Sequence, residues 1–370
     1  MRIGVPKEIK LQEHRIGLTP ESVKALTSKG HEVLVENNGG FEAGFTNEDY
    51  KSAGAKIANK ASDIFNNSDL IVKVKEPQAN EVAMIRENQI IYTYLHLAAT
   101  KELTEGLIKS KSICIAYETV TDDNGRLPLL APMSAVAGRM SIQAGAHSLE
   151  KNQNGRGLLL GGAPGVESAN VVILGGGVVG ENAALIATGM RANVFIVDKS
   201  SERLSQLKKI FGDKIKTVQS NEGELKKLIK KCDLLIGGVL IPGAEAPKLV
   251  TKDMIKSMKR GSVVVDVAID QGGCVETSKP TTHANPTYLV NDVVHYCVAN
   301  MPGGVPRTST MALNKATLPL LIKIADQGYE KTLKENKNYL AGLNVFKGNI
   351  TCKGVADAFG LKYFPGEKAL

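Results

Sequence analysis

Residues 170–198 read NVVILGGGVVGENAALIATGMRANVFIVD, and the architecture of the chain can be worked out from this segment. An apolar, β-branched run (residues 170–174) leads directly into Gly175-x-Gly177-x-x-Gly180. An alanine-rich segment with helical spacing follows, and a second apolar run ends at Asp198. This order predicts a strand, a tight turn, a helix and a second strand, which together form one βαβ unit.

The glycines and the acidic residue of this unit have the spacing of a dinucleotide-binding fingerprint. Gly175 allows the tight turn, Gly177 lets a pyrophosphate approach the backbone, and Gly180 lets the helix pack closely on the strand. The helix N-terminus adds N–H groups and the positive end of its dipole. Asp198, 18 residues after Gly180, would bind a ribose 2′-hydroxyl and repel a 2′-phosphate. The segment therefore predicts an NAD site; the alternative is a turn that merely permits close packing.

Length and composition indicate an ordinary globular protein of about two domains. The chain has 370 residues, of which 43% are hydrophobic and 23% charged. The net charge of +8 is scattered apart from a cluster at 226–231, which a solvated helix face explains better than a nucleic-acid surface. No signal peptide opens the chain and no apolar run reaches the ~18 residues of a membrane helix. We expect a cytoplasmic protein that binds neither nucleic acid nor a membrane.

The five cysteines indicate core thiols and not a metal or redox site. They form no C-x-x-C pair and show no metal-ligand spacing. Cys114 and Cys297 lie in apolar runs, as buried structural thiols do. No metal is expected.

Strand-like and helix-like segments alternate along the whole chain, which predicts an α/β fold with mostly parallel sheets. Strands are expected at residues 2–6, 32–36, 70–74, 90–95, 113–117, 216–219, 232–238, 263–267 and 295–299, besides the two of the glycine unit. Helices are expected after Thr19-Pro20-Glu21 and at residues 47–54, 60–67, 134–152, 201–211, 222–230, 251–258 and 306–328.

Two doubly wound, Rossmann-like domains follow from this alternation. The long helix at 306–328 would return the chain to the first domain, so the first domain is expected to be discontinuous. We predict a substrate domain at 1–133 and 305–370, with an NAD-binding domain at 134–304 inserted into it.

Polar residues follow several of the predicted strands, at the edge where an open parallel sheet binds its ligands. Arg15 lies in a polar turn after the first strand, and Lys75 follows the strand at 70–74. Strand alternation in IIYTYLHL puts Tyr92, Tyr94 and His96 on one face. The two cations suit a carboxylate, and a histidine can move a proton near neutral pH.

Asp270 lies just past the strand at 263–267 and before two glycines, again at the ligand edge. Each of these four residues also has a plain explanation when taken alone. Arg15 could form a surface salt bridge, Lys75 could be a solvated strand-end lysine, His96 a satisfied buried histidine, and Asp270 a turn residue. Their joint position at the edge of a sheet favours a substrate site.

Seven motifs in this order resemble bacterial alanine dehydrogenase: MRIGVPKEIK, HRIGLTP, VKVKEP, YTYLHLA, GGAPGV-x-x-A-x-VVILGGGVVG, VVVDVAIDQGG and NMPGGVPRTST. The resemblance covers nearly the whole chain. It implies reversible, NAD-dependent oxidative deamination of L-alanine to pyruvate and ammonium, by a homo-oligomer that is usually a hexamer. It also implies a cleft between the two domains. The same superfamily includes the NAD-binding subunit of proton-translocating transhydrogenase.

The resemblance further implies roles for single residues. Arg15 and Lys75 match the residues that hold the substrate carboxylate and carbonyl oxygen, His96 the acid/base, and Asp270 the residue that activates water. Further substrate-pocket positions are Glu76, Tyr94, Met133 and Asn300. The cofactor positions are Ser134, Gly175, Gly177, Val178, Val179, Gly180, Asp198, Arg203, Ser220, Val239, Leu240, Val267, Asp270, Val298, Asn300 and Met301.

Two other functions stay open at this point. One is a transhydrogenase subunit, which passes hydride to a membrane partner; the absence of a membrane helix or long linker before Leu370 disfavours it. The other is a regulator that senses NADH without catalysis, which the four polar residues at the strand ends disfavour. NADH formation from L-alanine and NAD⁺ would separate all three.

Overall fold

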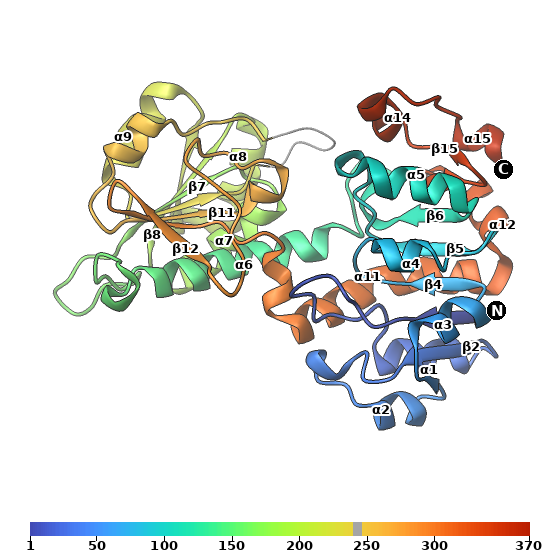
Figure 1. The fold of residues 1–370 in the computed structure, drawn as a ribbon. Helices are drawn as coiled ribbons and strands as arrows, with labels where there is room; N and C mark the ends of the chain where they lie inside the picture. Colours follow the sequence, from blue (N-terminus) through green and yellow to red (C-terminus); the bar gives the residue numbers. More distant parts are fainter. Residues whose placement is uncertain (240–245) are drawn as a thin grey trace. The chain divides into compact units, whose positions relative to one another are not determined.

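The chain divides into two units, each with a central sheet that has helices on both sides (Figure 1). The computed structural model describes residues 1–239 and 246–370. Unit 1 consists of Met1–Met133 and Val305–Leu370, and unit 2 consists of Ser134–Gly304. Unit 2 is thus inserted into the sequence of unit 1.

The described residues of unit 1 form an eight-stranded sheet in the order β15-β14-β6-β5-β4-β1-β2-β3. All pairings from β3 to β6 are parallel, whereas β14 and β15 are added in antiparallel pairs at one edge. The strands are β1 (Arg2–Val5), β2 (Glu32–Glu36), β3 (Lys56–Ala58), β4 (Leu70–Val72), β5 (Ile90–Thr93), β6 (Ile113–Ala116), β14 (Leu343–Phe346) and β15 (Asn349–Ile350).

Helices cover both faces of this sheet because the strand side chains are apolar on both faces. Ile71 and Ile91 share a buried cluster with residues of α3, α5 and α14. On the other face, Tyr92 donates its hydroxyl to the carbonyl of Thr317 in α11 (3.0 Å). The helices of unit 1 are α1 (Pro20–Thr27), α2 (Asn47–Ser52), α3 (Ala61–Asn67), α4 (Ala79–Val82), α5 (Lys101–Ser110), α11 (Pro306–Gln327), α12 (Tyr329–Lys334), α13 (Lys337–Leu340), α14 (Lys353–Phe359) and α15 (Gly366–Ala369).

The described residues of unit 2 form a seven-stranded sheet in the order β12-β13-β11-β10-β7-β8-β9. The pairings are parallel except that β12 joins the edge in antiparallel. Its strands are β7 (Asn170–Leu174), β8 (Asn193–Asp198), β9 (Ile215–Gln219), β10 (Leu234–Gly237), β11 (Val263–Asp266), β12 (Thr287–Val290) and β13 (Val293–Tyr296). Its helices are α6 (Ala131–Ser148), which begins three residues before the unit does, α7 (Val178–Gly189), α8 (Ser201–Phe211), α9 (Glu222–Lys231) and α10 (Lys252–Lys256).

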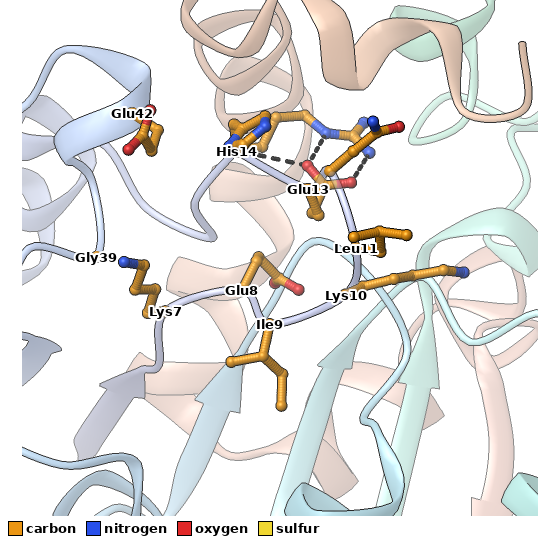
Figure 2. A pocket seen from close by; sticks show the side chains of 11 residues that line it. Lys7, Glu8, Ile9, Lys10, Leu11, Glu13, His14, Gly39 and Glu42 are labelled. Carbon is orange, nitrogen blue, oxygen red and sulfur yellow. Dashed lines mark hydrogen bonds and ion pairs between the residues drawn. The ribbon is translucent and has the colours of Figure 1, made fainter. Parts of the chain in front are cut away.

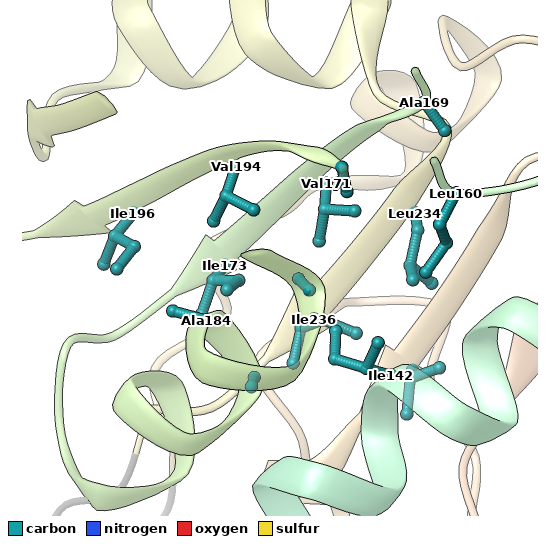
Figure 3. Close-up of a cluster of buried hydrophobic side chains, with 14 of the residues drawn as sticks. Ile142, Leu160, Ala169, Val171, Ile173, Ala184, Val194, Ile196, Leu234 and Ile236 are labelled. Atoms are coloured by element: carbon teal, nitrogen blue, oxygen red, sulfur yellow. The ribbon is translucent and has the colours of Figure 1, made fainter. Parts of the chain in front are cut away.

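Alternation along β7 divides the core of unit 2 between the two faces of its sheet. Val171 and Ile173 pack with Ala184 of α7 and Ile142 of α6 (Figure 3). The intervening Val172 packs with residues of α9 and α10 on the opposite face. This period of two is the expected pattern of a strand that is buried on both sides.

Both sheets reverse their strand order at one point. The chain runs from β1 to β2 and β3 in one direction, and then from β4 to β5 and β6 in the other. In the same way it runs from β7 to β8 and β9, and then from β10 to β11 and β13. Ligands of doubly wound sheets bind beyond the carboxyl ends of the strands at this reversal. The loops after β1 and β4, and those after β7 and β10, are therefore the places to look for a site.

The predicted fold class is confirmed, with corrections to several element boundaries. β4 ends at Val72 and not at residue 74, and β5 ends at Thr93 and not at residue 95. β10 begins two residues later than predicted, at Leu234, and β13 covers Val293–Tyr296 in place of residues 295–299. The four strands β3, β12, β14 and β15 were missed. They have two to four residues each.

Candidate functional site

The polar turn after β1 lines a pocket of about 290 Å³ (Figure 2). In this turn the carboxylate of Glu13 accepts hydrogen bonds from the Arg15 backbone N–H (3.1 Å), Nε (2.6 Å) and Nη2 (2.5 Å). The two side chains are 0% and 2% exposed, so Arg15 does not form a surface salt bridge. Nη1 of Arg15 also contacts Sδ of Met133 at 3.1 Å, which brings two predicted substrate residues together.

In the turn after β4, the main chain of Lys75 is held from two sides by groups of other segments. Its N–H lies 3.4 Å from Oε1 of Glu8, and its carbonyl accepts the hydroxyl of Thr93 at 3.0 Å. The next residue, Glu76, forms an ion pair with Lys10. Burial opposes ionisation of Glu76, but Lys75 and Lys10 outweigh it and lower the pKa of this carboxyl. Glu76 therefore stays ionised near neutral pH.

His96 lies beyond the end of β5, which corrects the predicted strand alternation. Its backbone is left-handed, with φ 49° and ψ 38°, a conformation that costs about 1–3 kcal/mol in a residue other than glycine. The carboxylate of Glu118 offsets this strain by accepting the N–H groups of Leu95 (3.1 Å) and His96 (2.6 Å). The His96 side chain is 42% exposed, so it is not a buried structural histidine.

Aromatic contacts set the orientation of the His96 ring. The ring stacks on Tyr94 with centroids 5.8 Å apart and an interplanar angle of 12°. Tyr94 in turn donates its hydroxyl to the carbonyl of Leu129 (2.6 Å) and packs edge-on against Tyr117. Burial raises the pKa of Tyr94 far above its ordinary value, so the phenol stays neutral. Tyr94 and His96 are thus neighbours, as predicted, but ring stacking beyond the end of β5 brings them together and not strand alternation.

In unit 2, the glycine turn between β7 and α7 has the geometry that a pyrophosphate needs. Gly175 has φ +92°, and a methyl group on Gly180 would lie 1.9 Å from the Gly175 carbonyl oxygen. Within residues 1–239 and 246–370, a methyl group on Gly177 would meet nothing within 4 Å, so these residues leave space open in front of the α7 N-terminus. No side chain of the same residues caps this end of the 12-residue helix, which leaves its first N–H groups to an anion.

Asp198 and Arg203 both hold Gly176, the middle residue of the turn. Oδ2 of Asp198 accepts the Gly176 N–H (2.6 Å), and Nε of Arg203 donates to the Gly176 carbonyl (2.6 Å). Arg203 also forms an ion pair with Glu181 of α7. Gly176 thus links the acid at the end of β8 to the turn after β7. This arrangement fits a dinucleotide whose ribose lies beside Asp198.

Asp270 lies in a 3₁₀ turn (Val267–Gln271) after β11, and its side chain is exposed. Oδ1 accepts the N–H of Asn300 at 3.2 Å, and Asn300 has a left-handed backbone with φ 61°. The carbonyl of Asn300 contacts Nε2 of His283 at 3.2 Å. Two predicted site residues from separate loops of unit 2 are therefore in contact.

The other predicted cofactor residues of unit 2 differ in exposure. Val179, Val298 and Met301 are buried, with Val298 and Met301 in the core cluster that α7 covers. Ser134, Val239 and Val267 are half-buried, whereas Val178 and Ser220 are exposed. Ser220 donates its N–H to the Asp198 carbonyl at 2.9 Å. The predicted contact at Leu240 lies outside the described residues.

The sequence patterns missed two charged residues that hold the candidate groups of unit 1. Glu118 braces the turn at His96, and Lys73 is a fully buried cation next to Glu8. A lysine inside the apolar run LIVKVK was the signal for a buried ion pair. Glu118 gave no signal, because its partners lie 22 and 23 residues earlier in the chain.

Comparison with known proteins shows the family of this chain. Profiles described as "Alanine dehydrogenase/PNT" match the chain, the N-terminal domain at residues 4–137 and the C-terminal domain at residues 141–353. An alanine dehydrogenase from Halomonas elongata is 56% identical over 98% of both chains. An alanine dehydrogenase from Methanococcus maripaludis is 53% identical over the full length of both.

Solved structures agree with the sequence comparison. A structure of an L-alanine dehydrogenase matches with a TM-score of 0.94 at 50% identity, over 97% of this chain and 99% of that chain. The structure of a transhydrogenase from Sinorhizobium meliloti matches with a TM-score of 0.82 at 24% identity, over 95% and 99% of the two chains. At that identity the second likeness concerns the fold alone.

Proposed function

Because the chain belongs to the alanine dehydrogenase/PNT family, we propose that it is an NAD-dependent alanine dehydrogenase. L-Alanine, NAD⁺ and water would give pyruvate, ammonium, NADH and a proton, and the reaction is reversible. The observation that carries this proposal is 56% identity to an alanine dehydrogenase over 98% of both chains. The protein is thus an oxidoreductase that acts on the CH–NH₂ group of an amino acid.

The proposal assigns NAD to unit 2, residues 134–304, and the substrate to unit 1, residues 1–133 and 305–370. When bound, NAD accepts the hydride from the substrate Cα. Gly175, Gly177 and Gly180 would hold its pyrophosphate, with the α7 N-terminus supplying N–H donors. Asp198 would accept hydrogen bonds from the ribose hydroxyls, and its negative charge would disfavour binding of a 2′-phosphate. The open space at Gly177 supports this assignment.

The cofactor assignment includes further residues of unit 2. Ser134 would bind the nicotinamide amide, and Arg203 would hold the turn closed through Gly176. The remaining proposed contacts come from backbone or side chains of Val178, Val179, Ser220, Val239, Leu240, Val267, Asp270, Val298, Asn300 and Met301.

In unit 1, Arg15 and Lys75 would bind and orient the substrate. A guanidinium suits the carboxylate of alanine or pyruvate, and the Glu13 ion pair fixes the plane of Arg15 before substrate arrives. Lys75 would act as a point charge at the carbonyl oxygen. Glu76, Tyr94 and Met133 are the further proposed substrate residues of this unit, and Asn300 is a proposed substrate residue of unit 2. These cations stabilise negative charge that develops on oxygen in the transition state.

His96 and Asp270 would carry the protons of the reaction. The ammonium group of alanine loses one proton and hydride leaves Cα, which together give an iminium. Asp270, aided by His96 and Lys75, would take a proton from the water that adds to this carbon. The resulting carbinolamine then releases ammonia and leaves the carbonyl of pyruvate. Asn300 supports the assignment of Asp270, since its N–H already holds one carboxylate oxygen in place.

The deciding experiment follows NADH absorbance after L-alanine is added to the purified protein with NAD⁺, and in reverse with pyruvate, ammonium and NADH. Turnover in both directions is expected, with none when alanine is omitted. NADH binding without turnover would favour the NADH-sensing regulator. Hydride exchange between NADH and an oxidised NADP analogue, without alanine turnover, would favour the transhydrogenase subunit.

Further proposals concern assembly and location. We expect a homo-oligomer, with a hexamer favoured by the family resemblance, and sedimentation equilibrium would measure it. We propose a cytoplasmic enzyme, because its substrates and NAD are intracellular metabolites. Among the described residues, no helix combines the length and apolar character needed to cross a bilayer.

A further inference from the structure

Unit 1 buries an ammonium group between two carboxylates, directly below the turn that carries Lys75. Nζ of Lys73 lies 3.1 Å from Oε2 of Glu8 and 2.8 Å from Oε1 of Glu81. Lys73 is 0% exposed and each glutamate side chain 1%. Burial alone would lower the pKa of Lys73, but the two glutamates outweigh it and raise that pKa. Lys73 is therefore an ammonium ion in the folded protein.

Stability alone does not explain this group of three. A buried ion pair often contributes less than apolar residues of the same volume would. Here the second carboxylate adds a negative charge that Lys73 does not neutralise, and burial raises the pKa of Glu8 in spite of Lys73. Such a group is a candidate for a role in function.

The two glutamates make matching contacts, but they hold different segments of main chain. Oε1 of Glu8 accepts the N–H of Val74 at 2.6 Å and lies 3.4 Å from the N–H of Lys75. Oε2 of Glu81 accepts the N–H of Gln78 at 2.7 Å, at the start of α4. Each carboxylate thus joins the same ammonium to a backbone amide, and only Glu8 holds the residues that position Lys75.

β4 ends at Val72, but backbone hydrogen bonds to the β5 segment continue as far as the Val74 carbonyl, which accepts the Tyr94 N–H at 3.3 Å. At the next residue, Lys75, the Glu8 carboxylate holds the N–H and the Thr93 hydroxyl holds the carbonyl. Glu8 comes from the turn that also carries Glu13 and Arg15. It therefore joins the loop after β1 to the loop after β4, across the reversal of the strand order.

We propose that Glu8, anchored by the ammonium of Lys73, is a positioning residue that fixes Lys75 relative to the Arg15 turn. The proposal rests on the proposed function, in which Arg15 and Lys75 bind one substrate molecule. Glu8 itself touches no reacting atom. It keeps the two cations at the separation that the carboxylate and the carbonyl oxygen of one substrate require, before the substrate binds.

The test compares E8Q with E81Q in the full-length enzyme. Both substitutions are isosteric, remove one negative charge from the same ammonium, and leave Lys73 with one carboxylate. We expect kcat/KM for pyruvate to fall about tenfold or more in E8Q and less than about threefold in E81Q. The Kd for NADH and the thermal midpoint should match between the two variants.

T93V and T93S test the same main-chain segment without changing any charge. T93V removes the hydroxyl that the Lys75 carbonyl accepts, whereas T93S retains it. We expect T93V to raise KM for pyruvate several-fold, in the direction of E8Q, and T93S to keep the wild-type KM. This pair carries the test if E8Q does not fold.

Two results would overturn the proposal: equal losses of kcat/KM in E8Q and E81Q, or a T93V variant with wild-type KM. The wild-type protein is assayed first with L-alanine and NAD⁺. Absence of turnover at that stage contradicts the proposed function, while normal wild-type turnover with unaffected E8Q and T93V enzymes contradicts only the role of Glu8.

Discussion

The two sheets reverse their strand order in the same way, yet the loops at the two reversals carry different kinds of residue. After β7 the chain places glycines, so main-chain N–H groups and open space face a ligand. After β1 it places charged side chains, and Glu13 holds Arg15 in a buried ion pair. In the proposed function, the same topology thus supports a phosphate site in unit 2 and a carboxylate site in unit 1. The strand order places a site, and the residues after the first strand select its ligand.

The largest expected effect separates the proton chemistry from cofactor binding. H96A in unit 1 and D270A in unit 2 should each lower kcat by about 10²–10⁴-fold, because each removes a general acid or base. The Kd for NADH, measured by fluorescence titration, should stay near the wild-type value in H96A, because His96 is not among the proposed cofactor contacts. H147A is the matched control, since the His147 side chain is 62% exposed. Near-wild-type turnover in H96A or D270A would exclude that residue from the proton transfers.

The next effect tests whether the unit 2 reversal binds through main chain. G177A adds a methyl group where no atom of the described residues lies within 4 Å, so the thermal midpoint should change little. The methyl group should displace the pyrophosphate and weaken NADH binding about 100-fold. G180A is the contrast, because its methyl group would lie 1.9 Å from the Gly175 carbonyl oxygen and should lower the thermal midpoint itself. If G177A binds NADH normally, the pyrophosphate does not lie at this turn.

Selection between NAD and NADP should depend on the carboxylate at the end of β8. D198A should weaken NAD binding about tenfold, because charge-assisted hydrogen bonds to the ribose are lost. It should also remove the repulsion of a 2′-phosphate and so narrow the preference for NAD over NADP. The ratio of the two kcat/KM values measures this. An unchanged ratio would assign the selection to another residue.

The smallest expected effect is the loss of stability when an exposed ion pair is removed. It is compared with the loss for the buried pair of Arg15 and Glu13. Arg2 and Asp69 are 51% and 43% exposed, and the Arg2 hydrogen bond lowers the pKa of Asp69. A depressed pKa stabilises the fold above the unfolded-state value of about 3.9, and this contribution is lost as the pH falls through the lower folded-state pKa. D69N should therefore lower the free energy of unfolding slightly at pH 7. In acid, the free energies of unfolding of D69N and the wild type should become equal.

Urea unfolding at low salt and in about 1 M salt measures this difference. The loss in D69N should shrink as salt screens the pair. E13Q removes the carboxylate that pairs with the buried Arg15. Its free energy of unfolding should fall by about 3–5 kcal/mol at either salt concentration. A loss in D69N as large as that in E13Q would mean that exposure does not separate the two pairs.

Much of the fold was predictable because it depends on neighbours in sequence. β7, the helix at 201–211 and the cap of α1, where Thr19 accepts the Ser22 N–H, all follow from local patterns. The glycine spacing likewise reports a turn whose constraints are internal to it, such as the close approach of Gly180 to Gly175. Edge strands such as β15 (Asn349–Ile350) were missed because two residues carry no periodicity.

The candidate site, like the fold, was predictable only where it depends on local sequence. The sequence by itself determined which residue types stand at the strand ends, including Arg15, Lys75 and Asp270. Only the tertiary structure decided how they are held: Lys73 meets Glu8 across 65 residues, and Glu118 reaches back to the strained backbone of His96. A buried charge takes its partner from whichever segment packs beside it. That choice depends on the strand order of the sheet, which no local pattern contains.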